Sequence, residues 1–436
     1  MLALFTAMPS LPALMPCAAG GRAGRPGLCA TSTGVPVVLR GANYIRLGGN
    51  TVGQQSKYHT TFDVGVYNRT RYNAAFDALH ADGFNVNRVF LDERPDSGIG
   101  GPANATAPLD SAWVDRLAEY IADAETRGIY TIVTTVYCPS NAYFRNVSDS
   151  LPPLPAAWRQ GGWNGAFLTR NHQAAWTAYA SALASALAAR LSPAARAATL
   201  VSLQNEFFLR GDEYPFSAAQ PGGHAAKVAG FGDGRAYDMA VASERQQAAD
   251  ANTNLWARSC AEAVRRHLPT SLVTVGVFTF AAVHKPGPNG LVAAGCEGGG
   301  GADGATGVDC RFPARPYWLS RGAGLSFLDV HIYQADGSPE ALAANLATEE
   351  WSKVANSTPI VMGEFGCNAK WGLNAMSCAP HVRELQRSSC EFGFSGWLFW
   401  TYDTAEQPDP HWYTMVEGGG AIGAVLAPRG NPEPCK

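Results

Sequence analysis

Residues 198–206 read ATLVSLQNE, a short apolar run that ends in a carboxylate. Seven other segments share this apolar, β-rich character, and they cover residues 35–45, 85–91, 129–137, 271–280, 325–333, 359–366 and 394–402. Each is almost continuously hydrophobic, which is typical of a strand in a parallel sheet that is buried on both faces. Helical patterns separate the eight segments. The sequence therefore predicts an α/β fold in which eight strand–helix units close into a (β/α)8 TIM barrel.

Three predicted connections from strand to helix are long, and they cover residues 138–170, 207–243 and 281–316. In a barrel of this kind these βα loops lie at the C-terminal face, where active sites are built. We expect one catalytic domain over residues 35–405. Residues 406–436 contain too few apolar residues to fold alone, so we expect a C-terminal extension that packs on the barrel.

The composition excludes several classes of function. Hydrophobic residues make up 46% of the 436 residues and charged residues 16%, which suits a globular protein with a sizeable core. The formal charge is only -3 and no long basic block is present, so nucleic acid is a poor candidate partner. No run of about 18 apolar residues exists, which argues against a transmembrane helix. We expect a monomer that binds a neutral or weakly charged substrate.

Several features indicate the secretory pathway. Residues 1–20 resemble a signal peptide in their apolar content and in the small residues Ala18 and Ala19 near their end, but they lack a basic start. A structural N-terminus is the alternative. Acceptor sites for N-linked glycans occur at Asn68, Asn104, Asn146 and Asn356. The ten cysteines form no CxxC pair, which favours disulfides over a zinc site. We therefore expect a secreted glycoprotein with disulfide bonds.

Two pairings of these cysteines are suggested by their positions. Cys296 and Cys310 bracket a glycine-rich stretch that is flexible enough to let a disulfide close the loop. Cys367 is expected to pair with Cys378 or Cys390 rather than to act as a reactive thiol.

Two carboxylates end predicted strands, where burial is costly without a purpose. Glu206 ends the fourth strand, and Glu364 ends the seventh within PIVMGEFG at residues 359–366. Hydrolysis of a glycosidic bond with retention needs two carboxyl groups about 5 to 5.5 Å apart, one to attack the anomeric carbon and one to protonate the leaving oxygen. Strand ends of a single barrel can supply such a pair.

The Asn205-Glu206 pair after strand four and Glu364 after strand seven resemble the signature of the retaining (β/α)8 glycosidases that include glycoside hydrolase family 5, the cellulase- and mannanase-like enzymes. This resemblance covers most of residues 35–405. It implies that Glu206 is the general acid/base and that Glu364 is the nucleophile. We expect Glu206 to have a raised pKa and Glu364 a lowered pKa, as these roles require.

The same resemblance implies further roles by position. Arg88 on strand two and Tyr333 after strand six would hydrogen-bond the nucleophile, and Asn205 would bind the sugar 2-hydroxyl. His331 also falls where family 5 has a site residue. Trp400, at the end of strand eight, would form the floor on which the attacked sugar stacks.

Strand three departs from the family pattern. Family 5 members generally carry a histidine at its end, whereas here the strand runs TIVTTVYCPS and Tyr137 or Cys138 stands at that position. The departure puts substrate contacts near this strand in doubt but leaves the two-carboxylate mechanism untouched.

Other residues have two interpretations. Aromatic residues in predicted loops could stack on sugars or simply pack, and they are Tyr143, Trp163, Trp371 and Trp412. Asp92 and Glu93, just after strand two, could line the cleft or lie in solvent at its rim.

The leading hypothesis is a retaining glycosidase, without cofactor or metal, that acts on β-linked glucosides or mannosides in polysaccharide, oligosaccharide or glycolipid. Transglycosylation on the same site is a close alternative, because a sugar can replace water in the second step. A non-catalytic barrel that binds carbohydrate or inhibits another enzyme is the alternative from a different class.

Overall fold

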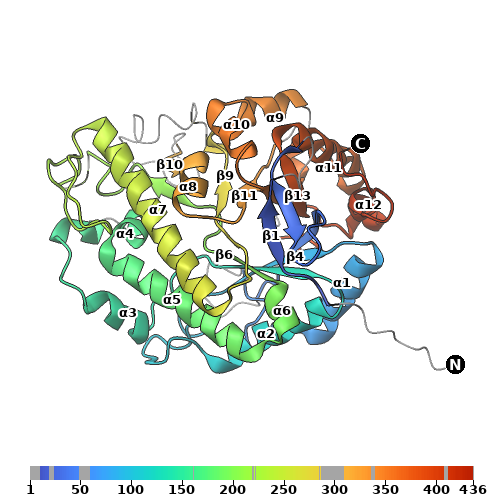
Figure 1. The fold of residues 1–436 in the computed structure, drawn as a ribbon, viewed down its shortest axis with the longest axis horizontal. Helices are drawn as coiled ribbons and strands as arrows, with labels where there is room; N and C mark the ends of the chain where they lie inside the picture. Colours follow the sequence, from blue (N-terminus) through green and yellow to red (C-terminus); the bar gives the residue numbers. More distant parts are fainter. Residues whose placement is uncertain are drawn as a thin grey trace.

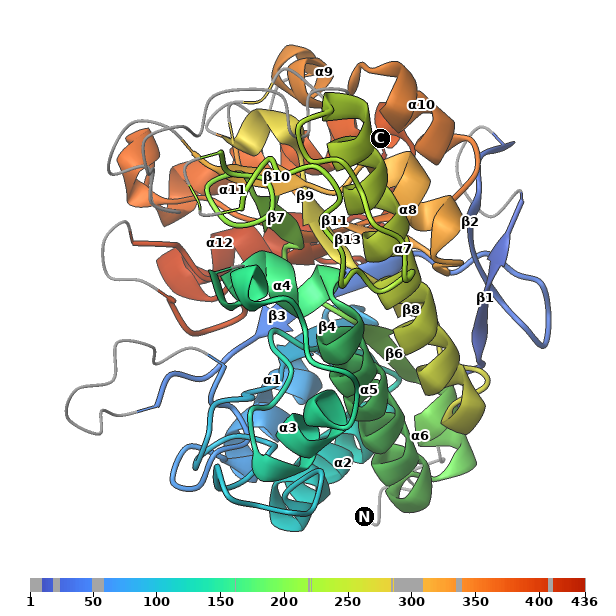
Figure 2. The ribbon, with the colours of Figure 1, turned by 90° about the vertical axis from the view of Figure 1, so that its left-hand side faces the viewer.

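The computed structural model describes residues 10–18, 24–48, 59–160, 162–218, 220, 222–283, 285, 309–334, 339–406 and 411–435. A parallel barrel forms its centre (Figures 1 and 2). The barrel strands are β3 (Leu39–Tyr44), β4 (Val86–Phe90), β5 (Tyr130–Thr134), β6 (Thr199–Ser202), β8 (Val273–Thr274), β9 (Gly276–Phe278), β11 (Leu328–His331), β12 (Ile360–Phe365) and β13 (Phe394–Phe399). All eight predicted strand segments contribute to it.

The barrel closes through the fifth strand segment. Neighbouring strands follow the order β8-β6-β5-β4-β3-β13-β12-β11-β9, and every pair is parallel. β8 and β9 are two halves of one segment, separated only by Val275, so the two ends of this order meet. The predicted (β/α)8 barrel is confirmed.

Helices surround the barrel and bury their apolar faces against it. They are α1 (Arg69–Ala81), α2 (Ser111–Glu125), α3 (Ala142–Asp149), α4 (Gly162–Leu168), α5 (Arg170–Arg190), α6 (Pro193–Ala197), α7 (Ala242–His267), α8 (Pro316–Gly322), α9 (Pro339–Leu346), α10 (Glu349–Ala355), α11 (Ala375–Ser389) and α12 (Glu417–Leu426). In α2, the Asp110 side chain caps the helix by accepting from the backbone of Trp113 at 2.7 Å. Trp113, Leu117 and Tyr120 on one face of α2 are almost fully buried. The long helices α5 and α7 lie side by side (Figure 2).

An N-terminal hairpin packs against the end of the barrel where the strands begin. It pairs β1 (Leu14–Cys17) with β2 (Gly27–Ala30), at the right-hand edge of Figure 2. Leu14 and Leu28 are buried in an apolar cluster with residues from the barrel strands, and a disulfide joins Cys17 to Cys29. The hairpin therefore includes part of the segment predicted as a signal peptide. Cleavage after Ala18 or Ala19 would remove β1 and break this disulfide.

The C-terminal segment packs against the barrel. Ile422 and Leu426 of α12 are buried, and the Arg40 guanidinium of β3 donates to the Leu426 carbonyl at 2.5 Å. A disulfide joins Cys390 to Cys435 and ties the end of the chain to α11.

A third disulfide joins Cys367 to Cys378, which confirms one of the two expected partners of Cys367. Cys296, the expected partner of Cys310, lies outside the described residues. Among the helices that the structure describes, none is long and apolar enough to cross a membrane.

Candidate active site

Two glutamates converge at the C-terminal mouth of the barrel. Glu206 follows β6, and Glu364 lies near the end of β12. One carboxylate oxygen of each glutamate and one ring nitrogen of His331 all lie within 4.8 Å of one another. The barrel thus brings together two carboxylates from distant parts of the sequence.

The backbone at Glu206 has an uncommon conformation. Its φ is +43°, in the left-handed region that residues other than glycine seldom adopt. The next amide, that of Phe207, donates to the Gly276 carbonyl at 2.7 Å. A β-carbon at Gly276 would lie 3.2 Å from the backbone nitrogen of Glu206 and 3.4 Å from Nε2 of His331. The glycine lets β9 approach both residues closely, and backbone strain of this kind clusters at functional sites.

Both carboxylate oxygens of Glu364 are held in place. Arg88 on β4 donates from Nη1 to Oε1 at 2.5 Å, and the Tyr333 hydroxyl donates to Oε2 at 2.8 Å. Glu364 is buried, so its orientation is determined by these contacts rather than by solvent. Arg88 and Tyr333 thus each contact one oxygen of the Glu364 carboxylate.

Arg88 is fully buried and links several strands. Its Nη1 also donates to Asn43 on β3 at 3.0 Å, and its Nη2 donates to Oδ1 of Asn205 at 2.8 Å. Its Nε lies 3.4 Å from the Asp329 carboxylate on β11. Asn205 accepts through its carbonyl oxygen, so its amide NH2 is the group that remains to donate to a substrate.

His331 lies between three carboxylates. Its Nδ1 is 3.1 Å from Glu206 Oε1 and 3.4 Å from Glu364 Oε2, while its Nε2 is 3.4 Å from Asp329 Oδ1. Burial acts to lower the pKa of His331, but the negative charges of Glu364 and Asp329 outweigh it and raise the pKa to about 9. The imidazole therefore carries a proton at neutral pH.

The pKa directions of the two glutamates are the reverse of those predicted from sequence. Burial acts to raise the pKa of Glu206, but the hydrogen bond and charge of His331 bring it below the usual value. Burial raises the pKa of Glu364 above its usual value, although His331 and Arg88 act to lower it. The sequence prediction took account neither of the burial of Glu364 nor of a protonated His331 beside Glu206.

The same three residues are close enough to one another to ligate a metal ion. However, Oε1 of Glu364 already contacts the Arg88 guanidinium at 2.5 Å, and His331 is itself cationic at neutral pH. A protonated imidazole offers no lone pair to a metal ion, and Arg88 already engages one oxygen of Glu364, so these three residues fit a metal ion poorly.

Aromatic residues pack around Arg88 and Tyr333, the two residues that bind Glu364. Trp400 is buried and meets the Phe90 ring edge-on at 5.5 Å between centroids. His59 stacks on Phe90 at 4.3 Å, and Trp412 packs edge-on against Tyr333 at 4.7 Å. Of the four loop aromatics considered from sequence, Trp412 is thus in contact with a residue that binds Glu364.

Comparison with known proteins identifies the fold. No protein-family model and no curated protein sequence matches the chain. The chain resembles the endo-beta-1,4-mannanase from Thermotoga petrophila with a TM-score of 0.52 at 14% identity, over 91% of this chain and 77% of that one. A second structure of a T. petrophila RKU-1 endo-1,4-beta-D-mannanase gives a TM-score of 0.50 at 14% identity, over 89% and 98%.

The chain has the fold of these β-mannanases. It also resembles the exo-beta-1,4-mannosidase Op5Man5 from Opitutaceae bacterium strain TAV5, with a TM-score of 0.48 at 16% identity over 85% of this chain. It spans only about half of that protein, 53% of its length.

Tyr137 and Cys138 follow β5, the third of the predicted strands. Tyr137 is exposed and meets the Trp163 ring edge-on at 6.0 Å, and Cys138 is half-buried beside it. Of the two interpretations given to Asp92 and Glu93, a position in solvent at the rim is wrong for Glu93. It is buried, accepts from the Val136 amide and the Tyr179 hydroxyl at 3.1 Å, and has a pKa that burial raises well above its usual value. Glu93 therefore links the segment after β5 to α5 through hydrogen bonds.

Asp92 is also buried, and it binds Arg94 through a side-chain ion pair at 2.5 Å. It does not lie in solvent at the rim. Its contact with Arg94 holds the loop that follows β4.

Four residues near the glutamates were missed in the sequence. Asn43 and Asp329 contact Arg88. His59 stacks on the Phe90 ring, which the Arg88 guanidinium also contacts. Burial and the charges of Glu364 and Glu206 raise the pKa of Glu406, in the loop after β13, to about 8. A polar residue inside an apolar strand was the available signal for Asn43 and Asp329. His59 and Glu406 lie in loops and carried no such signal.

Proposed function

We propose that this protein is a retaining glycoside hydrolase that cleaves β-linked glucosides or mannosides by double displacement. The observation that carries the proposal is that one carboxylate oxygen of Glu206 lies within 4.8 Å of one carboxylate oxygen of Glu364. Retaining enzymes place their carboxyl groups about 5 to 5.5 Å apart, whereas inverting enzymes need about 6.5 to 9.5 Å to admit a water molecule. The short separation supports direct attack by a carboxylate.

In the first step Glu364 attacks the anomeric carbon. The hydrogen bonds from Arg88 and Tyr333 to its two oxygens keep the carboxylate ionised and aimed at the sugar. Glu206 gives its proton to the leaving oxygen as the glycosidic bond breaks. In the second step Glu206 takes a proton from water, which attacks the glycosyl-enzyme and releases Glu364.

His331 supplies the proton that Glu206 needs. At neutral pH the proton lies on the imidazole, 3.1 Å from Glu206 Oε1. Its transfer converts an imidazolium–carboxylate pair into a neutral imidazole and a protonated Glu206, with no change in net charge. A sugar that displaces water from the site favours the neutral pair, because charges are costly in a less polar setting.

Two further residues recognise the attacked sugar. The free amide NH2 of Asn205 donates to the 2-hydroxyl, because its carbonyl oxygen is already bound to Arg88. Trp400 provides an apolar surface for the sugar ring. The three disulfides within the described residues support secretion of the enzyme, which we expect to act as a monomer.

The proposal is tested by hydrolysis of aryl β-glucosides, aryl β-mannosides and β-linked glucans and mannans. We expect wild type to release sugar whose anomeric configuration, followed by proton NMR, is first β. Glu364→Gln and Glu206→Gln should each reduce kcat by at least about 1000-fold on native substrates, while Glu391→Gln, which changes a carboxylate outside the site, should not.

Activated substrates separate the two roles. An aryl glycoside with a good leaving group needs no acid, so Glu206→Gln should retain its first step and accumulate glycosyl-enzyme, whereas Glu364→Gln should not react. Release of α-sugar first would rule out retention. Tight binding of oligosaccharide without turnover of any substrate would favour the non-catalytic alternative, and oligosaccharide products longer than the substrate would favour transglycosylation.

A further inference from the structure

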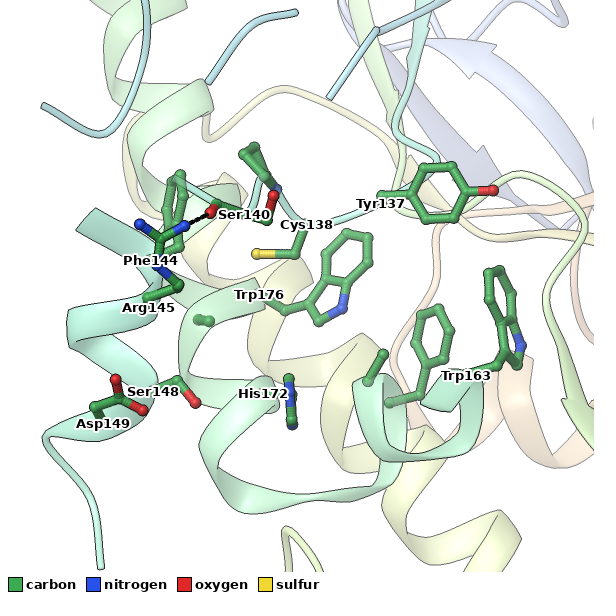
Figure 3. A pocket seen from close by; sticks show the side chains of 14 residues that line it. Tyr137, Cys138, Ser140, Phe144, Arg145, Ser148, Asp149, Trp163, His172 and Trp176 are labelled. Carbon is green, nitrogen blue, oxygen red and sulfur yellow. Dashed lines mark hydrogen bonds between the residues drawn. The ribbon is translucent and has the colours of Figure 1, made fainter. Parts of the chain in front are cut away.

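A cavity of about 350 Å³ lies beside the segment that follows β5 (Figure 3). It is lined by the segment after β5 and by α3, α4 and α5. Figure 3 shows the Cys138 sulfur and the rings of Trp176 and His172 directed into it, with Tyr137 and Trp163 at one end. None of these side chains has a role in the two-step mechanism.

Aromatic contacts connect this cavity to the acid/base. Phe207 and Phe208 follow Glu206 directly in the chain, and each touches a residue of the cavity wall. The Phe207 ring meets Phe167 edge-on at 5.0 Å, and the Phe208 ring stacks on Trp163 at 4.6 Å with an interplanar angle of 13°. The Trp163 indole also donates to the Phe208 carbonyl at 2.6 Å.

Two residues of the cavity wall, Trp163 and Phe167, therefore contact the two residues that follow the proton donor Glu206. Glu206 protonates the leaving oxygen, so the departing group must emerge on the side of Glu206. Tyr137, which is 54% exposed, stands at the same end of the cavity as Trp163 and offers an apolar surface to a group that passes from the barrel mouth.

The walls of the cavity suit an apolar group better than a sugar. His172 shares a hydrogen bond with Thr169 at 2.8 Å, and burial lowers its pKa, so it is neutral. Arg145 donates to the Ser140 and Ala103 carbonyls and, with Asp149, lies at the end opposite Tyr137. A sugar ring would leave several hydroxyls without partners against Trp163, Phe167 and Trp176, which is costly.

We propose that this cavity binds the apolar aglycone of the substrate, an alkyl or aryl group β-linked to the sugar. The enzyme then acts best on glycosides of apolar alcohols, and the aromatic row from Phe208 to Trp163 guides the aglycone past Glu206. This inference rests on the proposed function, because it takes Glu206 to mark the leaving-group side. Among the β-linked glucosides and mannosides that the mechanism permits, the inference specifies those with an apolar aglycone.

The test measures binding to the full chain carrying Glu364→Gln, which blocks turnover. Methyl, butyl, hexyl and octyl β-glucosides and β-mannosides are titrated by calorimetry below their micelle concentrations. We expect the Kd to fall by up to about fourfold for each added methylene until the cavity is filled. In wild type, kcat/KM should rise along the same series.

Ala166→Trp in the same background fills the cavity from α4, where Ala166 forms part of the wall. It should abolish the dependence on chain length and leave the Kd of the methyl glycoside within about twofold, because a methyl group is too short to fill the cavity. Ala189→Trp, on the exposed side of α5, is the matched control and should keep the full dependence. Ala175→Leu, from the facing helix, replaces Ala166→Trp if that variant does not fold.

The outcomes separate this inference from the proposed function. Methyl glycoside binding with no gain for longer chains would overturn the cavity proposal and leave the glycosidase intact. A gain that persists in Ala166→Trp would place the aglycone elsewhere and also overturn it. Absence of turnover in wild type on every glycoside would instead overturn the proposed function.

Discussion

The Asp329 carboxylate lies 3.4 Å from Nε2 of His331, and both side chains are completely buried. The two residues are two positions apart on β11, so they point to the same side of the strand, into the barrel. Gly363 on β12 makes the arrangement possible, because a β-carbon there would lie only 1.7 Å from Asp329 Oδ1. Asp329 is thus a negative charge placed beneath the proton-carrying histidine, and it also faces Arg88.

Replacing this charge should change the pH profile of the enzyme. The negative charge of Asp329 helps to raise the pKa of His331 to about 9, so its removal lowers that pKa. Above the pKa the site loses the proton that Glu206 needs. In Asp329→Asn we therefore expect the alkaline limb of kcat/KM, near pH 9 in wild type, to move to lower pH. NMR titration of the imidazole should show the same direction.

Asp77→Asn is a suitable control, because Asp77 is exposed and pairs with Arg127 at the surface. Asp77→Asn should leave the acidic and alkaline limbs of the pH profile of kcat/KM unchanged. A uniform loss of activity in Asp329→Asn at every pH, without movement of the limb, would show that Asp329 acts only through packing.

The Tyr333 hydroxyl should matter at the acidic limb. It donates to Glu364 Oε2 at 2.8 Å and so favours the ionised nucleophile. Tyr333→Phe should lower kcat/KM by about 10- to 100-fold, the effect of losing a hydrogen bond to a charged group. It should also move the acidic limb to higher pH, because the pKa of Glu364 rises. Tyr130→Phe removes a hydroxyl that binds the Pro12 carbonyl at the other end of the barrel, and it should move neither quantity.

Arg88 should contribute strongly to stability as well as to activity. Its guanidinium compensates the buried carboxylates of Glu364 and Asp329. Arg88→Met leaves both charges without a cation of this strength, so the free energy of unfolding in urea should fall by about 3 to 5 kcal/mol. Arg69 also bridges two carboxylates, but at the surface. Arg69→Met should therefore change the urea midpoint little, and an equal loss in both variants would contradict this explanation.

The N-terminal hairpin should stabilise the barrel. The disulfide between Cys17 and Cys29 closes a loop with a sequence separation of 12, for which removal of the cross-link costs about 3 kcal/mol. The double variant Cys17→Ser/Cys29→Ser should lose this amount of unfolding free energy in oxidising buffer. Mass spectrometry of the secreted chain provides the complementary measurement. An N-terminus after Ala19 would show that the mature protein lacks β1.

The strands and the positions of the two glutamates could be predicted from sequence for a simple reason. A strand buried on both faces is apolar along its whole length, and this property belongs to the segment itself. Glu206 and Glu364 stand out because each follows such a run. Once eight runs close into a barrel, every strand end lies at one face, so the two carboxylates must share it.

The hairpin, the roles of Glu93 and Asp329 and the aglycone cavity were not predictable in this way. Glu93 follows a predicted strand and was expected in a loop. It is buried, and Tyr179 of α5 donates a hydrogen bond to it. The cavity depends on how α3, α4 and α5 pack beside the residues after Glu206. Each of these features arises from contacts between segments that lie far apart in the chain.

Sequence by itself therefore determined the barrel and the two carboxylates at its mouth. Tertiary structure decided where the proton resides, since the pKa of Glu206 falls, that of Glu364 rises and His331 becomes the cation. Hydrophobic patterning is a local property that a linear sequence displays directly. The position of a proton depends on the balance between burial and several charges, and the distances that set this balance exist only after the chain has folded.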